Sequence, residues 1–188
     1  LLRSKEWYVN NKINLKLNTN IKFINHKNKS LSDEKDNLYY YDKLVIATGS
    51  KNNLLGIDTK EYQKGNFFSL RNLEDSKRIR KKISEVQTIT IIGAGFIGLE
   101  IATTALQLNK DVTIIENSEN IMGRSISKDL SKWLINYYTK SGIKFIFNKS
   151  FKSFKSDENS KINVILSDDT KINSEMVLIS AGLSLIHI

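Results

Sequence analysis

Apolar and polar residues follow two different periods between residues 88 and 116. Residues 88–92 form a β-branched run of strand length, and a second apolar run ends on Glu116. Between these runs, apolar residues recur at the three- and four-residue spacing of a helix, at Ile97, Ile101, Ala102, Ala105, Leu106 and Leu108. This order predicts a strand, a helix and a second strand, which together form a βαβ unit.

The same patterns predict further elements on both sides of this unit. Helical spacing predicts helices over residues 2–11, 72–84 and 128–140, and Asn72 is a residue type that caps a helix start. Alternating or apolar runs predict strands over residues 13–17, 21–25, 143–147, 151–154, 162–166 and 176–180, and a buried strand over 44–46. We therefore expect an α/β protein with a Rossmann-like parallel sheet and additional antiparallel strands.

Three glycines join the first strand of the βαβ unit to its helix. Gly93 allows a tight turn, Gly95 lets the backbone approach a pyrophosphate, and Gly98 lets the helix pack against the strand. The start of the helix offers unpaired N–H groups and the positive end of its dipole to an anion. This context predicts that the turn binds a dinucleotide.

Glu116 ends the second strand, 23 residues after Gly93. A carboxylate at this place accepts hydrogen bonds from the adenosine ribose hydroxyls and repels a 2′-phosphate. No arginine occurs among the three residues that follow it. The sequence therefore favours NAD over NADP.

Composition limits the remaining chemistry. The 188 residues include no cysteine, so this segment forms no disulfide, thiolate iron–sulfur cluster or cysteine zinc site. The net charge of +9 comes from lysines scattered along the chain without a nucleic-acid motif, so we expect no nucleic-acid partner, although a basic face would steer an acidic protein. No apolar run reaches the ~18 residues of a membrane span. We expect a cytoplasmic protein, and an internal fragment because residue 1 is leucine.

Residues 41–50, which read YDKLVIATGS, and the residues GAGFIGLE at 93–100 resemble the pyridine nucleotide-disulfide oxidoreductase superfamily. The resemblance extends from residue 1 to about residue 183. Within it, LLR at 1–3, EWY at 6–8 and SLRNLED at 69–75 are most similar to the NADH-dependent ferredoxin and rubredoxin reductases. This resemblance implies an enzyme that passes electrons from NADH through FAD to a small iron–sulfur protein.

The resemblance also implies a division of the chain and an FAD site. It assigns residues 1–56 to a partial FAD-binding domain, residues 57–182 to an NAD-binding domain and residues 183–188 to a tail outside the family pattern. The residues implied to contact FAD are Ile21, Ala47, Thr48, Gly49 and Arg71. The FAD-phosphate glycine motif of the family is absent, so we expect FAD binding by this fragment to be incomplete.

On the NAD side, the resemblance implies roles for residues around the glycine turn. Phe96 gates the nicotinamide pocket, Glu100 lies near the nicotinamide, and Arg124 flanks the adenosine. Ile97 and Gly182 complete the implied cofactor-binding set. We expect no side chain to act as an acid, base or nucleophile and no metal ligands, because the cofactors carry the chemistry.

Other functions are compatible with the same residues. An NADH oxidase, NADH peroxidase or disulfide reductase would carry its reactive cysteine upstream of residue 1. A nitrite-reductase-type NADH module would carry iron–sulfur domains downstream. A regulator that senses NAD would use the same βαβ unit without turnover.

Overall fold

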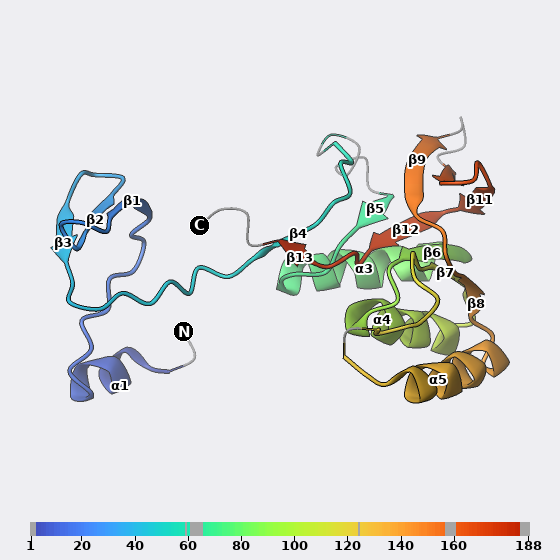
Figure 1. Cartoon of the computed structure of the whole chain (residues 1–188), viewed down its shortest axis with the longest axis horizontal. Helices are drawn as coiled ribbons and strands as arrows, with labels where there is room; N and C mark the ends of the chain where they lie inside the picture. Colours follow the sequence, from blue (N-terminus) through green and yellow to red (C-terminus); the bar gives the residue numbers. More distant parts are fainter. Residues whose placement is uncertain (1–2, 59, 61–65, 124, 157–160, 185–188) are drawn as a thin grey trace. The chain divides into compact units, whose positions relative to one another are not determined.

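The structure is a computed structural model that describes residues 3–58, 60, 66–123, 125–156 and 161–184. Its contacts divide the chain into two compact units, residues 1–48 and residues 49–188 (Figure 1). The division falls before the boundary expected after residue 56. The reason is that β4 (Lys51–Asn52) pairs with β13 (Leu183–Ser184), which ties residues 51 and 52 to the second unit.

The first unit combines one short helix with a three-stranded antiparallel sheet. The helix α1 (Lys5–Asn10) starts where the Ser4 side chain accepts a hydrogen bond from the Trp7 N–H. The sheet has the order β1-β2-β3, formed by β1 (Ile21–Asn25), β2 (Ser30–Asp33) and β3 (Leu38–Tyr40). The predicted helix and the strand at 21–25 are thus present.

Two strand predictions in the first unit are wrong. Residues 13–17 and 44–46 form no strand, and Val45 is 86% exposed. Both runs are apolar enough to suggest a strand, but a strand also needs a neighbour that accepts and donates its backbone hydrogen bonds. Within the described residues of this chain, no neighbouring strand pairs with either run.

A single carboxylate organises the β2–β3 hairpin. Asp33 is buried and accepts hydrogen bonds from the backbone N–H groups of Lys35 and Asn37, at 2.9 and 3.0 Å. It also accepts bonds from the Asn37 amide and the Tyr39 hydroxyl, at 3.0 and 2.8 Å. These bonds, the one from the Asn37 side chain foremost, lower the pKa of Asp33 to about 2. This hairpin therefore has a hydrogen-bonded carboxylate where other hairpins have a hydrophobic core. We call Asp33 and its donors Lys35, Asn37 and Tyr39 the Asp33 hub.

The second unit is built on a parallel five-stranded sheet of order β5-β12-β6-β7-β8. Its strands are β5 (Phe67–Phe68), β6 (Thr88–Ile92), β7 (Asp111–Ile115), β8 (Lys144–Ile146) and β12 (Met176–Ile179). The predicted βαβ unit corresponds to β6, α4 (Phe96–Gln107) and β7. The expected α/β class with a parallel sheet and antiparallel strands is confirmed.

Both faces of this sheet are covered, which explains its continuous apolar strands. Ile91 and Ile114 point to the face packed by α3 (Leu73–Glu85), α4 and α5 (Lys128–Lys140). Ile92 and Ile115 point to the other face, which is packed by the antiparallel strands β9 (Phe151–Ser156), β10 (Ile162–Leu166) and β11 (Lys171–Ser174). In Figure 1, α4 and α5 lie on the opposite side of the sheet from β9 and β11.

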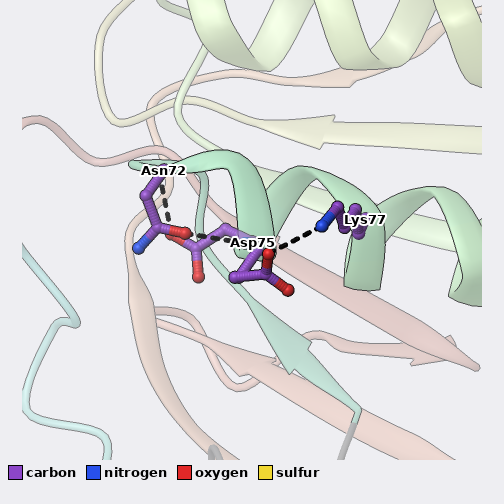
Figure 2. A network of polar contacts seen from close by, with 4 residues as sticks. Asn72, Asp75 and Lys77 are labelled. Atoms are coloured by element: carbon purple, nitrogen blue, oxygen red, sulfur yellow. Dashed lines mark hydrogen bonds and ion pairs between the residues drawn. The ribbon is translucent and has the colours of Figure 1, made fainter. Parts of the chain in front are cut away.

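The start of α3 is fixed by a reciprocal cap (Figure 2). The Asn72 side chain accepts from the Asp75 N–H at 2.9 Å, while the Asp75 carboxylate accepts from the Asn72 N–H at 3.2 Å. At the same end of α3, Lys77 forms an exposed ion pair of 2.7 Å with Glu74. The predicted cap is confirmed, and it ties the residues just before the helix to its first turn.

Candidate functional site

Gly93 follows β6 and adopts a backbone that only glycine tolerates easily. Its φ is +103°, and a Cβ at this position would lie 2.6 Å from the Ser180 carbonyl oxygen. Its N–H donates to the Ile115 carbonyl at the end of β7, at 2.8 Å. The turn is therefore held between the ends of β7 and β12.

The other two glycines of the turn serve different purposes. A Cβ on Gly98 would collide with the Gly93 carbonyl oxygen and would lie 2.7 Å from the Ser180 hydroxyl, so Gly98 lets α4 pack closely on the turn. A Cβ on Gly95 would meet nothing within 4 Å. Gly95 therefore leaves space on the outer side of the turn that the fold itself does not need.

The start of α4 offers unpaired N–H donors. Gly95 is the N-cap residue, and it provides no side-chain acceptor. The first amide of this helix with an acceptor is that of Leu99, which donates to the Gly95 carbonyl at 3.1 Å. Within the described residues, the N–H groups of Gly95, Phe96 and Ile97 have no acceptor. Together with the helix dipole, these amides form a site that favours an anion.

A cleft of about 750 Å³ opens beside these amides. Its walls come from the glycine turn and from the segments that follow β7, β8 and β12, so it lies at the carboxyl edge of the sheet. Ligands of open α/β sheets bind at this edge. The lining includes Gly93, Gly95, Phe96, Glu116, Ser118, Asn120, Lys149, Phe151, Ser180 and Gly182.

Glu116 directs its carboxylate toward the glycine turn. Its Oε2 accepts from the Ala94 N–H at 2.8 Å, and its Oε1 accepts from the Ser118 N–H and hydroxyl, both at 3.0 Å. The carboxylate is half-buried at the wall of the cleft. The cleft thus combines unpaired amides with a fixed carboxylate acceptor, and the binding of a cofactor by these groups stays a prediction.

An ion pair lies at the rim of the cleft. Lys149, which lines the cleft, is 2.7 Å from the Asp168 carboxylate in the turn after β10. The hydrogen bond from Lys149, followed by that from Thr170, lowers the pKa of Asp168 to about 2. The Lys149 ammonium is therefore paired with a carboxylate that is ionised at neutral pH, and it does not face the ligand space as an unpaired cation.

Phe96 separates this cleft from a smaller cavity of about 210 Å³. The side chain is 58% exposed, and it lines both spaces, as does Gly182. Ile97 and Leu70 line only the smaller cavity. An exposed aromatic ring between two cavities fits the gating role that the sequence resemblance implies, and that role stays a prediction.

Two of the residues implied to contact FAD lie together in the second unit. The Arg71 Nε donates to the Ser50 carbonyl at 3.0 Å, and a Cβ on Gly49 would lie 3.5 Å from the Arg71 Nη2. The Arg71 backbone N–H in turn donates to the Asp75 carboxylate at 2.9 Å. The cap of α3 therefore also holds Arg71.

The other predicted site residues fall into three groups. Glu100 is exposed on α4 and lines neither cavity, so nothing in this structure places it beside a nicotinamide. Ile21, Ala47 and Thr48 are exposed residues of the unit 1–48. Arg124 lies outside the described residues.

The structure brings forward residues that the sequence reasoning missed. The Ser180 hydroxyl donates to the Gly93 carbonyl at 2.8 Å and holds the turn from the end of β12. Ser118 bonds to Glu116, and Lys149 lines the rim. All three residues follow parallel strands, and ligands of such sheets bind where the carboxyl ends of the strands meet. The position of these residues after predicted strands is therefore a signal that could have identified them.

Metal-ligand clusters and membrane-spanning helices are both absent from the described part of the chain. Within it, no cluster of three or more His, Asp or Glu side chains is arranged to hold a metal ion. No described helix is long and apolar enough to span a bilayer.

Comparison with known proteins gives consistent matches. A rubredoxin-NAD(+) reductase of Pseudomonas putida is 28% identical over 96% of this chain and 46% of its own length. A ferredoxin reductase from Rhodopseudomonas palustris superposes with a TM-score of 0.83 at 23% identity, over 97% of this chain and 45% of that one. A putidaredoxin reductase in covalent complex with putidaredoxin superposes with a TM-score of 0.81 at 27% identity, over 97% of this chain and 44% of that one.

The chain spans just under half the length of these relatives. Residues 5–186 match the family described as pyridine nucleotide-disulphide oxidoreductase. The match covers both units and includes residues 41–50 and 93–100, the segments that carry the sequence resemblance. The chain belongs to the pyridine nucleotide-disulphide oxidoreductase family.

Proposed function

We propose that the protein containing this chain is an NADH-dependent flavoprotein oxidoreductase. It takes electrons from NADH through FAD and passes them to a small iron–sulfur protein of the ferredoxin or rubredoxin type. Relatives named rubredoxin-NAD(+) reductase and a reductase complexed with putidaredoxin support this choice of acceptor. NADH is a cytoplasmic metabolite, so the proposed location is the cytoplasm.

The observation that carries the proposal is the pairing of unpaired amides with a carboxylate in one cleft. The N–H groups of Gly95 and Phe96, two residues that line this cleft, suit the two negative phosphates of a dinucleotide. Glu116 lines the same cleft at the end of β7, where its oxygens suit a ribose diol. An inorganic anion would need the amides alone, whereas NADH carries both the phosphates and the ribose diol that these two features suit.

The FAD site is proposed from a smaller set of residues. Arg71 presents its guanidinium beside Gly49, and a guanidinium suits a phosphate or a polarised carbonyl group. Ala47, Thr48 and Ile21 are the residues that the family pattern adds from the unit 1–48. When bound, the flavin supplies the chemistry, accepting a hydride and releasing single electrons, and these residues bind and orient it.

An anaerobic titration of the intact protein tests the proposal directly. We expect NADH to bleach the yellow flavin absorbance at stoichiometric addition, and NADPH to do so only at much higher concentration. Addition of an oxidised ferredoxin or rubredoxin should then restore the absorbance. A colourless protein that binds NADH without any redox change would instead be a sensor.

Glu116→Arg tests the basis of the NADH preference. Arginine removes the diol acceptor and offers a cation to a 2′-phosphate, so the ratio of NADH to NADPH affinity should fall by at least about tenfold. Equilibrium binding of both nucleotides measures this ratio. An unchanged ratio would contradict the proposed ribose role of Glu116.

A further inference from the structure

The Ser118 hydroxyl lies between two acceptors. Its oxygen is 3.0 Å from the Glu116 Oε1 and 2.8 Å from the Asn120 carbonyl oxygen. A hydroxyl has one proton, and neither a carboxylate nor a carbonyl can donate to it. The hydroxyl can therefore satisfy only one of these two acceptors fully at any moment, and both are already within reach.

The hydrogen-bond capacity of Glu116 gives this choice a consequence. An ionised carboxylate accepts about four hydrogen bonds, two at each oxygen. Two positions are taken by backbone donors, the N–H groups of Ala94 and Ser118. When the Ser118 hydroxyl also points to Oε1, it takes a third position, and one remains on Oε2. A vicinal diol, which donates two hydrogen bonds, needs two.

We propose that Ser118 is a positioning residue whose hydroxyl is a displaceable donor to Glu116. It pairs with the carboxylate when the cleft holds no nucleotide, and it turns to the Asn120 carbonyl when an adenosine ribose diol binds. The inference rests on the proposed NADH site. The two backbone donors keep the carboxylate oriented throughout, because neither depends on the Ser118 side chain.

This exchange lowers the affinity of the wild-type protein for the nucleotide. A hydrogen bond to a charged acceptor is about twice as strong as one to a neutral carbonyl, so turning the hydroxyl to Asn120 has a free-energy cost. Ser118→Ala removes the hydroxyl and with it that cost, while the backbone N–H at 118 remains. The variant should therefore bind the diol more tightly, by about fivefold.

The experiment measures equilibrium binding of NAD⁺ to the oxidised, intact protein by calorimetry, because NAD⁺ binds without reducing the flavin. The second ligand is the analogue of NAD⁺ that lacks the adenosine 2′-hydroxyl. This analogue has one ribose donor left, which the vacant position on Oε2 can accept. Ser118→Ala should raise the affinity for NAD⁺ about fivefold. The affinity for the analogue should stay within about twofold of the wild-type value.

Two variants serve as controls. Ser118→Thr keeps a hydroxyl and should restore the wild-type affinity for NAD⁺. Ser84 is exposed on α3 and lines neither cavity, so Ser84→Ala should change neither affinity. Thermal unfolding of each variant verifies that the fold is retained.

The possible outcomes separate this inference from the proposed function. Ser118→Ala could lower the affinity for NAD⁺, leave it unchanged, or change the affinities for both ligands equally. Each of these results would contradict the proposal that Ser118 is a displaceable donor, although NAD⁺ would still bind. If the wild-type protein binds neither ligand, the proposed NADH site itself fails, and the inference fails with it.

Discussion

The two units of this chain contain similar apolar residues but bury them very differently. In the unit 49–188, Ile91 and Ile114 are completely buried between the parallel sheet and its helices. In the unit 1–48, Phe23 is 61% exposed and Tyr40 75% exposed. Among the described residues of that unit, only Ser30 and Asp33 are buried, and both are polar.

This difference teaches that residue type alone does not determine burial. A sheet buries its apolar side chains only where a second layer covers that face, and the second unit has a layer on each side. The three-stranded sheet of the first unit is held mainly by its own backbone bonds and by the Asp33 hub. Truncation of an apolar side chain should therefore lower the stability much more in the second unit than in the first.

The largest expected effect contrasts the two kinds of apolar residue. Ile91→Ala should lower the free energy of unfolding by about 3–4 kcal/mol, because it removes three buried carbons and leaves a cavity under the helices. Phe23→Ala should change it by less than about 0.5 kcal/mol, because most of that ring is already in water. Denaturant unfolding followed by circular dichroism measures both values. Similar losses from the two variants would contradict the contrast in packing.

A smaller effect is expected at the glycine turn, where stability and binding can be separated. Gly98→Ala should lower the free energy of unfolding by about 2–3 kcal/mol, because the added Cβ collides with the Gly93 carbonyl. Gly95→Ala should lower the free energy of unfolding by less than about 1 kcal/mol, because the added Cβ meets open space. It should nevertheless weaken NADH binding about tenfold or more by obstructing the amides. Full NADH affinity in Gly95→Ala would show that the ligand does not approach this side of the turn.

The smallest effect at neutral pH concerns the Asp33 hub. Folding lowers the pKa of Asp33 from 3.8 to about 2, so its contribution is complete above about pH 4 and is lost as the pH falls toward 2. Acid titration of the β2–β3 hairpin, followed by NMR shifts of Tyr39 and Asn37, should show this loss. Asp33→Asn should abolish the transition. Persistence of the same acid transition in that variant would assign it to another carboxylate.

The sequence predicted the second unit better than the first. The helices α3, α4 and α5 and the strand β10 occur where periodicity placed them, because each has one clear apolar face or run and neighbours that cover it. The strands β4, β5 and β13 have only two residues each, which is too short for any period to appear. The strands β2 and β3 were missed because their stability comes from the hydrogen bonds of Asp33 and not from an apolar pattern.

The sequence predicts only the part of the candidate site that depends on local pattern. The glycine turn and Glu116 are recognisable because the spacing between them is set within one local βαβ unit. Ser180 acts through a contact that depends on tertiary structure, because it meets Gly93 across 87 positions of sequence. Ser118 contacts residues only two positions away, but no motif in the sequence marks that turn. The wrong strand prediction at 44–46 shows that a local pattern can also mislead. Its residues are apolar, but no strand pairs with them among the described residues.

The position of β12 in the sheet has a consequence for biosynthesis. β12 is inserted between β5 and β6, although residues 176–179 are translated about ninety positions after β6. A nascent chain therefore exposes one edge of β6 until the ribosome has released those residues, and unpaired edges of this kind invite aggregation. Pausing of translation before this strand would prolong that vulnerable interval, and chaperone binding to the emerging β6 edge would shorten the exposure.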